Sequence, residues 1–163
     1  MSQSIAFIGV GNMGCPMAEN LMKANKTVKV FDVSKKMLDI ARDKKLETVS
    51  NLDDLITGDV DTVITMLPEG KHSKEVYLGE KGIINKVSKD CLLIDCSTID
   101  IQTSIEIGNK ASEKQILMID APVSGGVMGA QKATLNIMVG GSKEAFEKAL
   151  PLLKIMGKNI FHA

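Results

Sequence analysis

The sequence contains no tryptophan, and aromatic residues make up only 3% of its 163 residues. A surface that binds single-stranded nucleic acid by stacking bases on aromatic rings is therefore not expected. Basic and acidic residues number 20 each, so the chain also lacks the basic surplus of a nucleic-acid-binding protein. No apolar run approaches the roughly 20 residues of a membrane-spanning helix. We predict no nucleic-acid partner and no membrane partner.

The chain is also poor in cysteine and histidine. The three cysteines, Cys15, Cys91 and Cys96, are odd in number and irregularly spaced, which argues against a disulfide framework. We expect them to be small buried residues in a reducing compartment. No cluster of histidine, cysteine and aspartate has metal-ligand spacing, so no metal site is predicted.

The N-terminus shows no targeting signal, which favours the cytoplasm, with a mature mitochondrial form as the alternative.

Short apolar runs alternate with helical patterns along the chain. The runs are nearly continuous and rich in isoleucine, leucine and valine, as is typical of strands buried on both faces of a parallel sheet. They cover residues 5–9, 28–32, 60–67, 91–96 and 116–121. Apolar residues spaced by three or four predict helices around residues 13–22, 37–44, 52–56 and 101–111. This alternation predicts one α/β domain over residues 1–163, with a Rossmann-type, doubly wound, mainly parallel sheet.

The last part of the chain follows a different pattern. Residues 135–141 predict a strand closed by two glycines, and Ser142 is expected to cap the helix that follows. Pro151 predicts a kink in that helix or the start of a second short helix. The last five residues predict one more short strand. Ser50 is expected to cap the helix at residues 52–56.

Three glycines follow the first predicted strand. Gly9, Gly11 and Gly14 have the G-x-G-x-x-G spacing, between a strand and a helix as a dinucleotide-binding motif requires. The first glycine permits a tight turn, the second lets the backbone approach a pyrophosphate, and the third lets the helix pack closely on the strand. The N-terminus of the helix adds positive potential for phosphates.

An acidic residue ends the second predicted strand. Asp32 stands where a carboxylate accepts hydrogen bonds from the adenosine ribose of a dinucleotide. A carboxylate there repels the 2′-phosphate of NADP, and no arginine follows it directly. The sequence therefore favours NAD, although Lys35 and Lys36 lie nearby.

Two further strand ends carry candidate cofactor residues. Leu67 and Pro68 end the strand at 60–67 and are expected to form an apolar wall against the cofactor. Ser97 and Thr98 follow the strand at 91–96, where they are expected to cap the next helix and to face the nicotinamide. His72 is expected in the loop after Pro68, as a bystander near the cofactor.

The segment "DAPVSGG" follows the strand at 116–121. The hydroxyl group of Ser124 and the N–H groups of Gly125 and Gly126 form a candidate anion cradle. A carboxylate is the natural occupant, because the first glycine loop already accounts for the phosphates. A purely structural Gly-Gly turn is the alternative interpretation.

Several motifs resemble one family in order along the chain. They are "FIGVGNMGCPMAENL", "VFDVS", "ITMLPEG", "LLIDCSTID", "DAPVSGGVMGAQKATLNIMVGG" and "LLKIMG". The chain resembles the 3-hydroxyisobutyrate dehydrogenases of the β-hydroxyacid dehydrogenase family. The resemblance implies an N-terminal Rossmann-type NAD domain, followed in the family by a C-terminal helical domain. It also implies oxidation of a 3-hydroxy acid to a semialdehyde by hydride transfer to NAD.

The resemblance also implies roles for individual residues. The implied NAD-binding residues are Gly9, Val10, Gly11, Asn12, Met13, Gly14, Asp32, Val33, Met66, Leu67, Pro68 and Thr98. Ser124, Gly125 and Gly126 are implied to bind the carboxylate of a small hydroxy-acid substrate. The family's catalytic lysine lies beyond the position of Ala163, so no catalytic residue is expected here and the chain alone is expected to be inactive. His72 and Ala133 depart from the family pattern, which commonly has a smaller polar residue and a glycine there.

Other functions fit the same sequence. A sister substrate such as tartronate semialdehyde is a near alternative, whereas phosphogluconate is disfavoured because Asp32 disfavours NADP. A non-catalytic NAD-binding or scaffold protein is an alternative from a different class. Self-association is expected through the apolar surface that the helical domain covers in the family.

Overall fold

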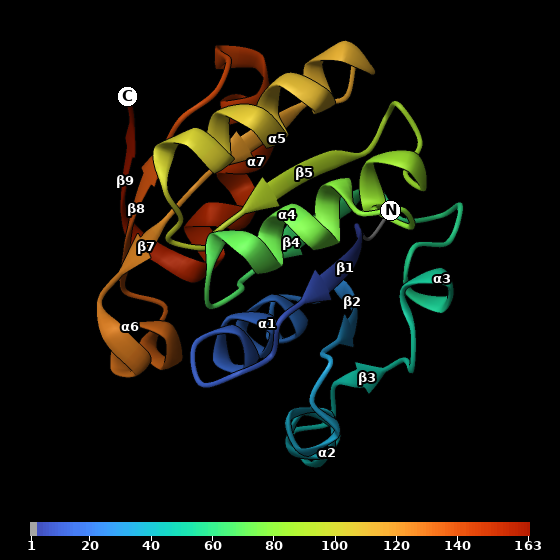
Figure 1. Ribbon diagram of the computed structural model, residues 1–163. Coiled ribbons are helices and arrows are strands. Elements are labelled where there is room, and N and C mark those ends of the chain that lie inside the picture. The colour runs from blue at the N-terminus through green and yellow to red at the C-terminus, as the bar shows by residue number, and fades with distance from the viewer. Residues whose placement is uncertain (1–2) are drawn as a thin grey trace.

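The computed structural model describes residues 3–163, and its centre is a six-stranded parallel sheet (Figure 1). The strand order is β3-β2-β1-β4-β5-β6, the order of a doubly wound dinucleotide-binding fold. The strands are β1 (Ser4–Ile8), β2 (Thr27–Phe31), β3 (Glu47–Thr48), β4 (Thr62–Thr65), β5 (Leu92–Asp95) and β6 (Met118–Asp120). The Rossmann-type fold predicted from the sequence is confirmed.

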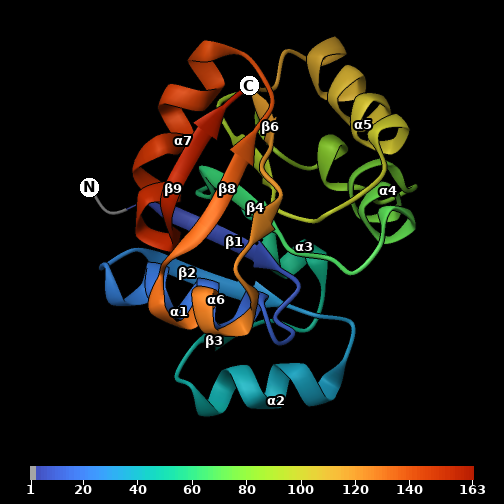
Figure 2. The ribbon, with the colours of Figure 1, turned by 90° about the vertical axis from the view of Figure 1, so that its left-hand side faces the viewer.

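Both faces of this sheet are covered by helices. In β1, Ile5 and Phe7 are buried in one apolar cluster, whereas Ala6 and Ile8 are buried in the other, as the two-residue period of a strand requires. The first cluster includes residues of α1 (Gly14–Lys23), α2 (Lys35–Asp43) and α7 (Lys143–Met156). The second includes residues of α3 (Leu52–Leu55), α4 (Gly70–Leu78), the 3₁₀ turn η1 (Ile83–Asn85) and α5 (Ile101–Glu113). Figure 2 shows α7 on one side of the sheet and α4 and α5 on the other.

Polar side chains cap several of these helices, but two of the predicted caps are wrong. Asn51, not Ser50, caps α3, with its side chain accepting a hydrogen bond from the backbone N–H of Asp54. Asp100, not Ser97 or Thr98, caps α5. In both cases several capping residue types stand close together, and the sequence does not show which one has an extended backbone and an oxygen within reach of the first turn.

The helix α4 was not predicted, and the loop assignment of His72 is wrong because His72 lies within it. Its segment is polar and begins with glycine, so it lacks an obvious apolar period. Ser73 and Tyr77, four residues apart, are the buried residues of this helix. Tertiary burial of a serine and a tyrosine, rather than an aliphatic stripe, defines its inner face.

A second sheet lies beyond the main one and has three strands in the order β7-β8-β9. The strands β7 (Val123–Ser124) and β8 (Leu135–Val139) are antiparallel, and α6 (Gly126–Lys132) connects them. The strand β9 (Gly157–His162) pairs in parallel with β8, so the predicted final strand is confirmed. An isolated bridge between Asp120 and Gly140 links the end of β6 to the second sheet.

The helix α7 continues through Pro151, so the predicted alternative of a second short helix is wrong. Pro151 is exposed, whereas Ala149, Leu152 and Leu153 beside it are buried. The proline removes one backbone hydrogen bond, but it does so on the solvent side, where water can satisfy the freed carbonyl group. Burial of the flanking apolar residues holds the helix together.

The three cysteines are free and buried, as the sequence predicts. Burial raises the pKa of Cys91 to about 12 and also raises the pKa of Cys15. These thiols are therefore protonated near neutral pH and behave as packing groups. Within residues 3–163, no helix is both long enough and apolar enough to cross a membrane.

Ala133 follows α6 in a left-handed conformation, with φ of 57°. Glycine adopts this conformation without the steric cost that alanine bears there. We expect Ala133→Gly to stabilise the protein by about 0.5–1 kcal/mol in urea unfolding monitored by circular dichroism. Ala24→Gly is the matched control, because Ala24 ends α1 with φ of −88° and gains no such relief. Equal effects of the two substitutions would contradict the assignment of strain to Ala133.

Candidate functional site

An open cavity of about 520 Å³ lies where the first glycine loop and the C-terminal ends of β2 and β4 meet. Its lining combines the glycine loop, the segment after β2, the segment after β4 and one face of α4. The lining residues are Ile8, Gly9, Gly11, Asn12, Met13, Gly14, Phe31, Asp32, Val33, Met37, Met66, Leu67, Pro68, His72, Glu75 and Val76. Ligands bind at such a C-terminal rim in doubly wound sheets.

The three glycines of the loop have different surroundings. Gly9 has φ of +98°, and a Cβ there would lie 2.2 Å from the carbonyl oxygen of Met66. A Cβ on Gly14 would lie 1.8 Å from the carbonyl oxygen of Gly9. Gly11, in contrast, has ordinary φ, and a Cβ there would have no non-neighbouring atom of the described chain within 4 Å. Gly9 and Gly14 are thus needed for the fold, whereas the open side of Gly11 faces the cavity.

The N-terminus of α1 opens at this loop. Among residues 3–163, no side chain caps it at Met13, and its first turn contains no acidic residue. The partial positive charge of the helix end is therefore not offset locally, which suits an anion. The open Gly11 backbone and this helix end together fit the pyrophosphate of a dinucleotide.

Asp32 lies on the rim of the same cavity, half-buried at the end of β2. Its Oδ2 accepts a hydrogen bond from the backbone N–H of Val10 at 2.9 Å, and its Oδ1 accepts one from Ser34 N–H at 2.8 Å. Each carboxylate oxygen keeps one more lone-pair direction for a ribose hydroxyl group. None of the described residues that line the cavity is lysine or arginine.

The walls of the cavity are mainly apolar. Met66, Leu67 and Pro68 come from the segment after β4, and Val33 and Met37 come from the segment after β2. Such paired apolar walls suit a flat ring with polar groups at its edge.

The helix α4 adds His72, Glu75 and Val76, which sequence reasoning missed as site residues because it missed the helix. The Nδ1 atom of His72 is buried without a partner among residues 3–163.

Two of the predicted cofactor residues are not in this lining. Val10 is buried, and its backbone N–H holds Asp32 in place. Thr98 is exposed after β5. Its neighbour Ser97 is buried, and the Ser97 hydroxyl accepts a hydrogen bond from the backbone N–H of Leu67 at 2.7 Å.

The predicted carboxylate cradle lies outside the cavity lining, at the junction of β7 and α6. Ser124, Gly125 and Gly126 are all exposed, and both glycines have positive φ, of 133° and 67°. The helix α6 is held near α1 by a hydrogen bond from Asn20 Nδ2 to the carbonyl oxygen of Ala130, at 2.8 Å. The cradle is thereby fixed on the side of α1.

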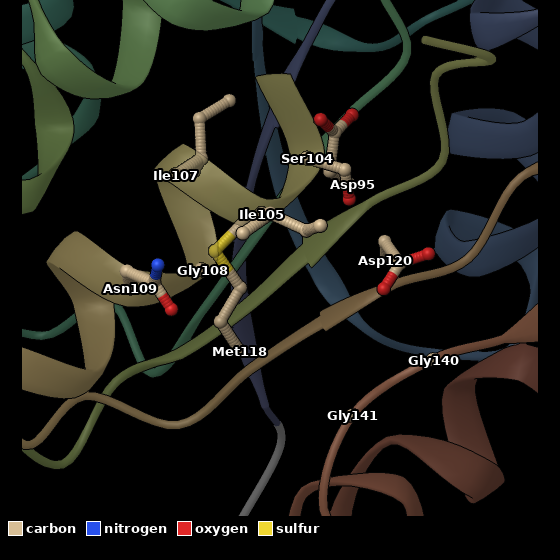
Figure 3. A pocket seen from close by; sticks show the side chains of 10 residues that line it. All are labelled: Asp95, Ser104, Ile105, Ile107, Gly108, Asn109, Met118, Asp120, Gly140 and Gly141. Atoms are coloured by element: carbon tan, nitrogen blue, oxygen red, sulfur yellow. The ribbon is translucent and has the colours of Figure 1, made fainter. Parts of the chain in front are cut away.

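A second cavity, of about 270 Å³, lies between α5, the ends of β5 and β6, and the loop at Gly140–Gly141 (Figure 3). Asp95 and Asp120, register partners on β5 and β6, are among its lining residues. None of the predicted cofactor or substrate residues lines it.

Comparison with known families agrees with this geometry. A family model described as "NAD binding domain of 6-phosphogluconate dehydrogenase" matches residues 4–163. The chain belongs to this family of NAD-binding domains. The resemblance to β-hydroxyacid dehydrogenases is confirmed, and NAD is the cofactor of this domain.

Relatives of this NAD-binding domain include two curated enzymes of Pseudomonas aeruginosa. A 3-hydroxyisobutyrate dehydrogenase is 45% identical over 159 residues, which are 98% of this chain and 53% of the relative. An NAD-dependent L-serine dehydrogenase is 43% identical over 161 residues, which are 99% of this chain and 54% of the relative. The chain thus spans about half the length of the curated relatives it matches.

A similar structure is that of a Mycobacterium tuberculosis 3-hydroxyisobutyrate dehydrogenase with L-serine. It superposes on this NAD-binding domain with a TM-score of 0.93 at 36% identity, covering 99% of this chain and 54% of that chain. Both bacterial and mitochondrial enzymes occur among the curated relatives. The cytoplasmic location therefore stays a prediction.

Proposed function

We propose that this chain is the NAD-binding half of a dehydrogenase that oxidises a small 3-hydroxy carboxylic acid to its semialdehyde. The observation that carries the proposal is the cavity in which the open backbone at Gly11 lies beside the uncapped N-terminus of α1, with Asp32 on the rim. Bound NAD supplies the hydride acceptor, and the residues of this chain bind and orient it.

Each part of the cavity has a distinct role in this proposal. The N–H groups of the segment from Gly11 to Gly14 and the positive end of α1 hold the pyrophosphate. Asp32 accepts hydrogen bonds from the ribose hydroxyls, with its own position fixed by Val10 and Ser34. The segment Met66–Pro68 excludes water from one side of the cofactor, and Thr98 lies next to that segment's anchor, Ser97.

The substrate proposal rests on Ser124, Gly125 and Gly126. Their exposed hydroxyl and N–H groups suit a carboxylate. 3-Hydroxyisobutyrate and L-serine, named for the relatives, share a carboxylate and a hydroxyl group on the carbon two bonds away. The proposed substrate class is defined by these two groups, and L-serine is a second candidate because of the relative that oxidises it.

The proton acceptor for the substrate hydroxyl group is proposed to lie outside these 163 residues. Asp32, His72 and Glu75 are the titratable groups in the cavity lining, and no lysine of the described chain is among them. Without a positioned base, hydride transfer loses a factor of roughly 10²–10⁴. A non-catalytic NAD-binding or scaffold protein is the competing function. Self-association through the apolar surface that the helical domain covers in the family stays a prediction.

Titration calorimetry tests the proposal. We expect the chain to bind NAD and, once saturated with NAD, to bind 3-hydroxyisobutyrate or L-serine weakly. Ser124→Ala is expected to reduce carboxylate binding about fivefold and to leave NAD binding unchanged, because one hydrogen bond of typical net strength is lost. Ser88→Ala, at an exposed serine before β5, is the matched control.

Absorbance at the NADH band distinguishes the two functions. We expect no appreciable NADH from the 163-residue chain with either hydroxy acid. Ordinary turnover would place the base within this chain and contradict that part of the proposal. Absence of NAD binding would contradict all of it.

A further inference from the structure

A buried carboxyl group lies beneath α4, in the apolar cluster on that side of the sheet. Asp95 ends β5 and is 1% exposed. Its register partner on β4 is Thr65, whose hydroxyl donates a hydrogen bond to Asp95 Oδ1 at 2.9 Å. That hydroxyl lies 2.7 Å from the phenol oxygen of Tyr77. Because the single proton of the Thr65 hydroxyl goes to Asp95, the Tyr77 hydroxyl donates a hydrogen bond to Thr65.

The same carboxyl group reaches the cofactor cavity through Ser97. The backbone N–H of Ser97 donates to Asp95 Oδ1 at 3.0 Å, and the Ser97 hydroxyl accepts from the backbone N–H of Leu67 at 2.7 Å. Leu67 lines the cavity, and its side chain is the wall next to Gly9. One continuous chain of hydrogen bonds thus runs from Tyr77 through Thr65, Asp95 and Ser97 to the cavity wall.

These contacts explain why a polar residue occupies such a costly position. A carboxyl group buried among apolar side chains loses hydration that a structural apolar residue would not need. Burial raises the pKa of Asp95, although hydrogen bonds from Ser97 and Thr65 lower it in part. Asp95 Oδ2 and Ser73 Oγ are both buried without a geometric hydrogen-bond partner in residues 3–163.

We propose that Asp95 is a positioning residue of the NAD site, which sets the backbone of Leu67 through Ser97 and thereby the apolar wall of the cofactor cavity. This inference rests on the proposed function, because it assigns Leu67 to the NAD site. Asp95 itself does not line the large cavity, so its effect on NAD is transmitted through the Ser97 hydroxyl and the Leu67 N–H.

The decisive variant is Ser97→Ala, which leaves Asp95 in place and removes the acceptor for Leu67. The NAD dissociation constant, measured by calorimetry, is expected to rise about fivefold or more, the factor that one hydrogen bond of typical net strength supplies. Asp95→Ala is expected to weaken NAD binding at least as much. Asp95→Asn keeps an Oδ1 acceptor for Thr65 and Ser97, and is expected to bind NAD within about twofold of the parent.

Thr62→Val is the matched control. Thr62 is 2% exposed at the opposite end of β4, where its hydroxyl bonds to Asp61 and not to this chain of contacts. It is expected to lose stability without changing the NAD dissociation constant. Parent-like NAD binding by Ser97→Ala, or equal losses in Asp95→Asn and Asp95→Ala, would overturn the proposal. If Asp95→Ala does not fold, Ser97→Ala and Asp95→Asn decide it.

A second measurement separates this inference from the proposed function. Amide hydrogen exchange at Leu67, followed by NMR, is expected to accelerate in Ser97→Ala and Asp95→Ala beyond the change in global unfolding, but not in Thr62→Val or Asp95→Asn. If the parent protein does not bind NAD but the variants show this exchange pattern, the proposed function is refuted and the link from Asp95 to Leu67 is retained. Unchanged exchange at Leu67 would refute the link itself.

Discussion

Gly11→Ala is expected to abolish most NAD binding while the protein stays folded. A Cβ at this position meets no atom of the described chain within 4 Å, and the backbone φ suits alanine. The same methyl group would stand in the cavity where a pyrophosphate must approach the backbone. We expect the NAD dissociation constant in calorimetry to rise about 100-fold, or ~2.7 kcal/mol, with a urea midpoint close to that of the parent.

Gly14→Ala provides the contrast, because there the new methyl group lies inside the fold. Its Cβ would lie 1.8 Å from the carbonyl oxygen of Gly9 and 3.2 Å from the Phe7 ring, so β1 and α1 must separate. We expect a loss of ~3–5 kcal/mol in the free energy of unfolding. If Gly11→Ala unfolds the protein as readily as Gly14→Ala, or binds NAD normally, the assignment of Gly11 to the pyrophosphate is wrong.

Asp32→Asn is expected to weaken NAD binding and reduce discrimination against NADP. The substitution removes the charge that opposes a 2′-phosphate, and it weakens hydrogen bonds to the ribose that are worth ~1.5–3 kcal/mol with a charged acceptor. The NAD dissociation constant is therefore expected to rise roughly 10- to 100-fold in calorimetry, while that for NADP changes less. Asparagine keeps an acceptor for one of the N–H groups of Val10 and Ser34, whereas alanine would leave both unpaired.

Asp39→Asn is the control for the loss of one negative charge. Asp39 is exposed on α2, pairs with Arg42, and does not line the cavity. Its substitution is expected to change neither cofactor affinity. A parent protein that binds NAD and NADP equally well would show that Asp32 does not discriminate between them.

Much of the site follows from local sequence. The glycine loop and Asp32 occupy adjacent strand ends, and the parallel sheet places both at one rim because crossovers bring successive strands into the same direction. The need for glycine at position 14 arises within a few residues, because a Cβ there would meet the carbonyl oxygen of Gly9. The strand runs were recognisable because strands buried on both faces have continuous apolar sequences.

Several of the errors arose where a residue's role depends on a distant partner. His72 and Ser73 have no apolar pattern, and they are helical because Tyr77 and Ser73 pack beneath α4. Ser97 was assigned as a helix cap, yet its hydroxyl accepts from Leu67, which lies 30 residues away. Pro151 was expected to kink its helix or to start a second one, and α7 continues through it because its buried neighbours hold the helix intact.

The sequence by itself determined the alternation of strands and helices, the cofactor loop and the acidic residue opposite it, because these depend on local backbone geometry and on the burial of continuous apolar runs. Only the tertiary structure decided which polar groups meet. Thr65, Asp95 and Ser97 form one connected network beneath the cavity wall because β4 and β5 are paired in register, and pairing between strands far apart in the chain leaves no local signal.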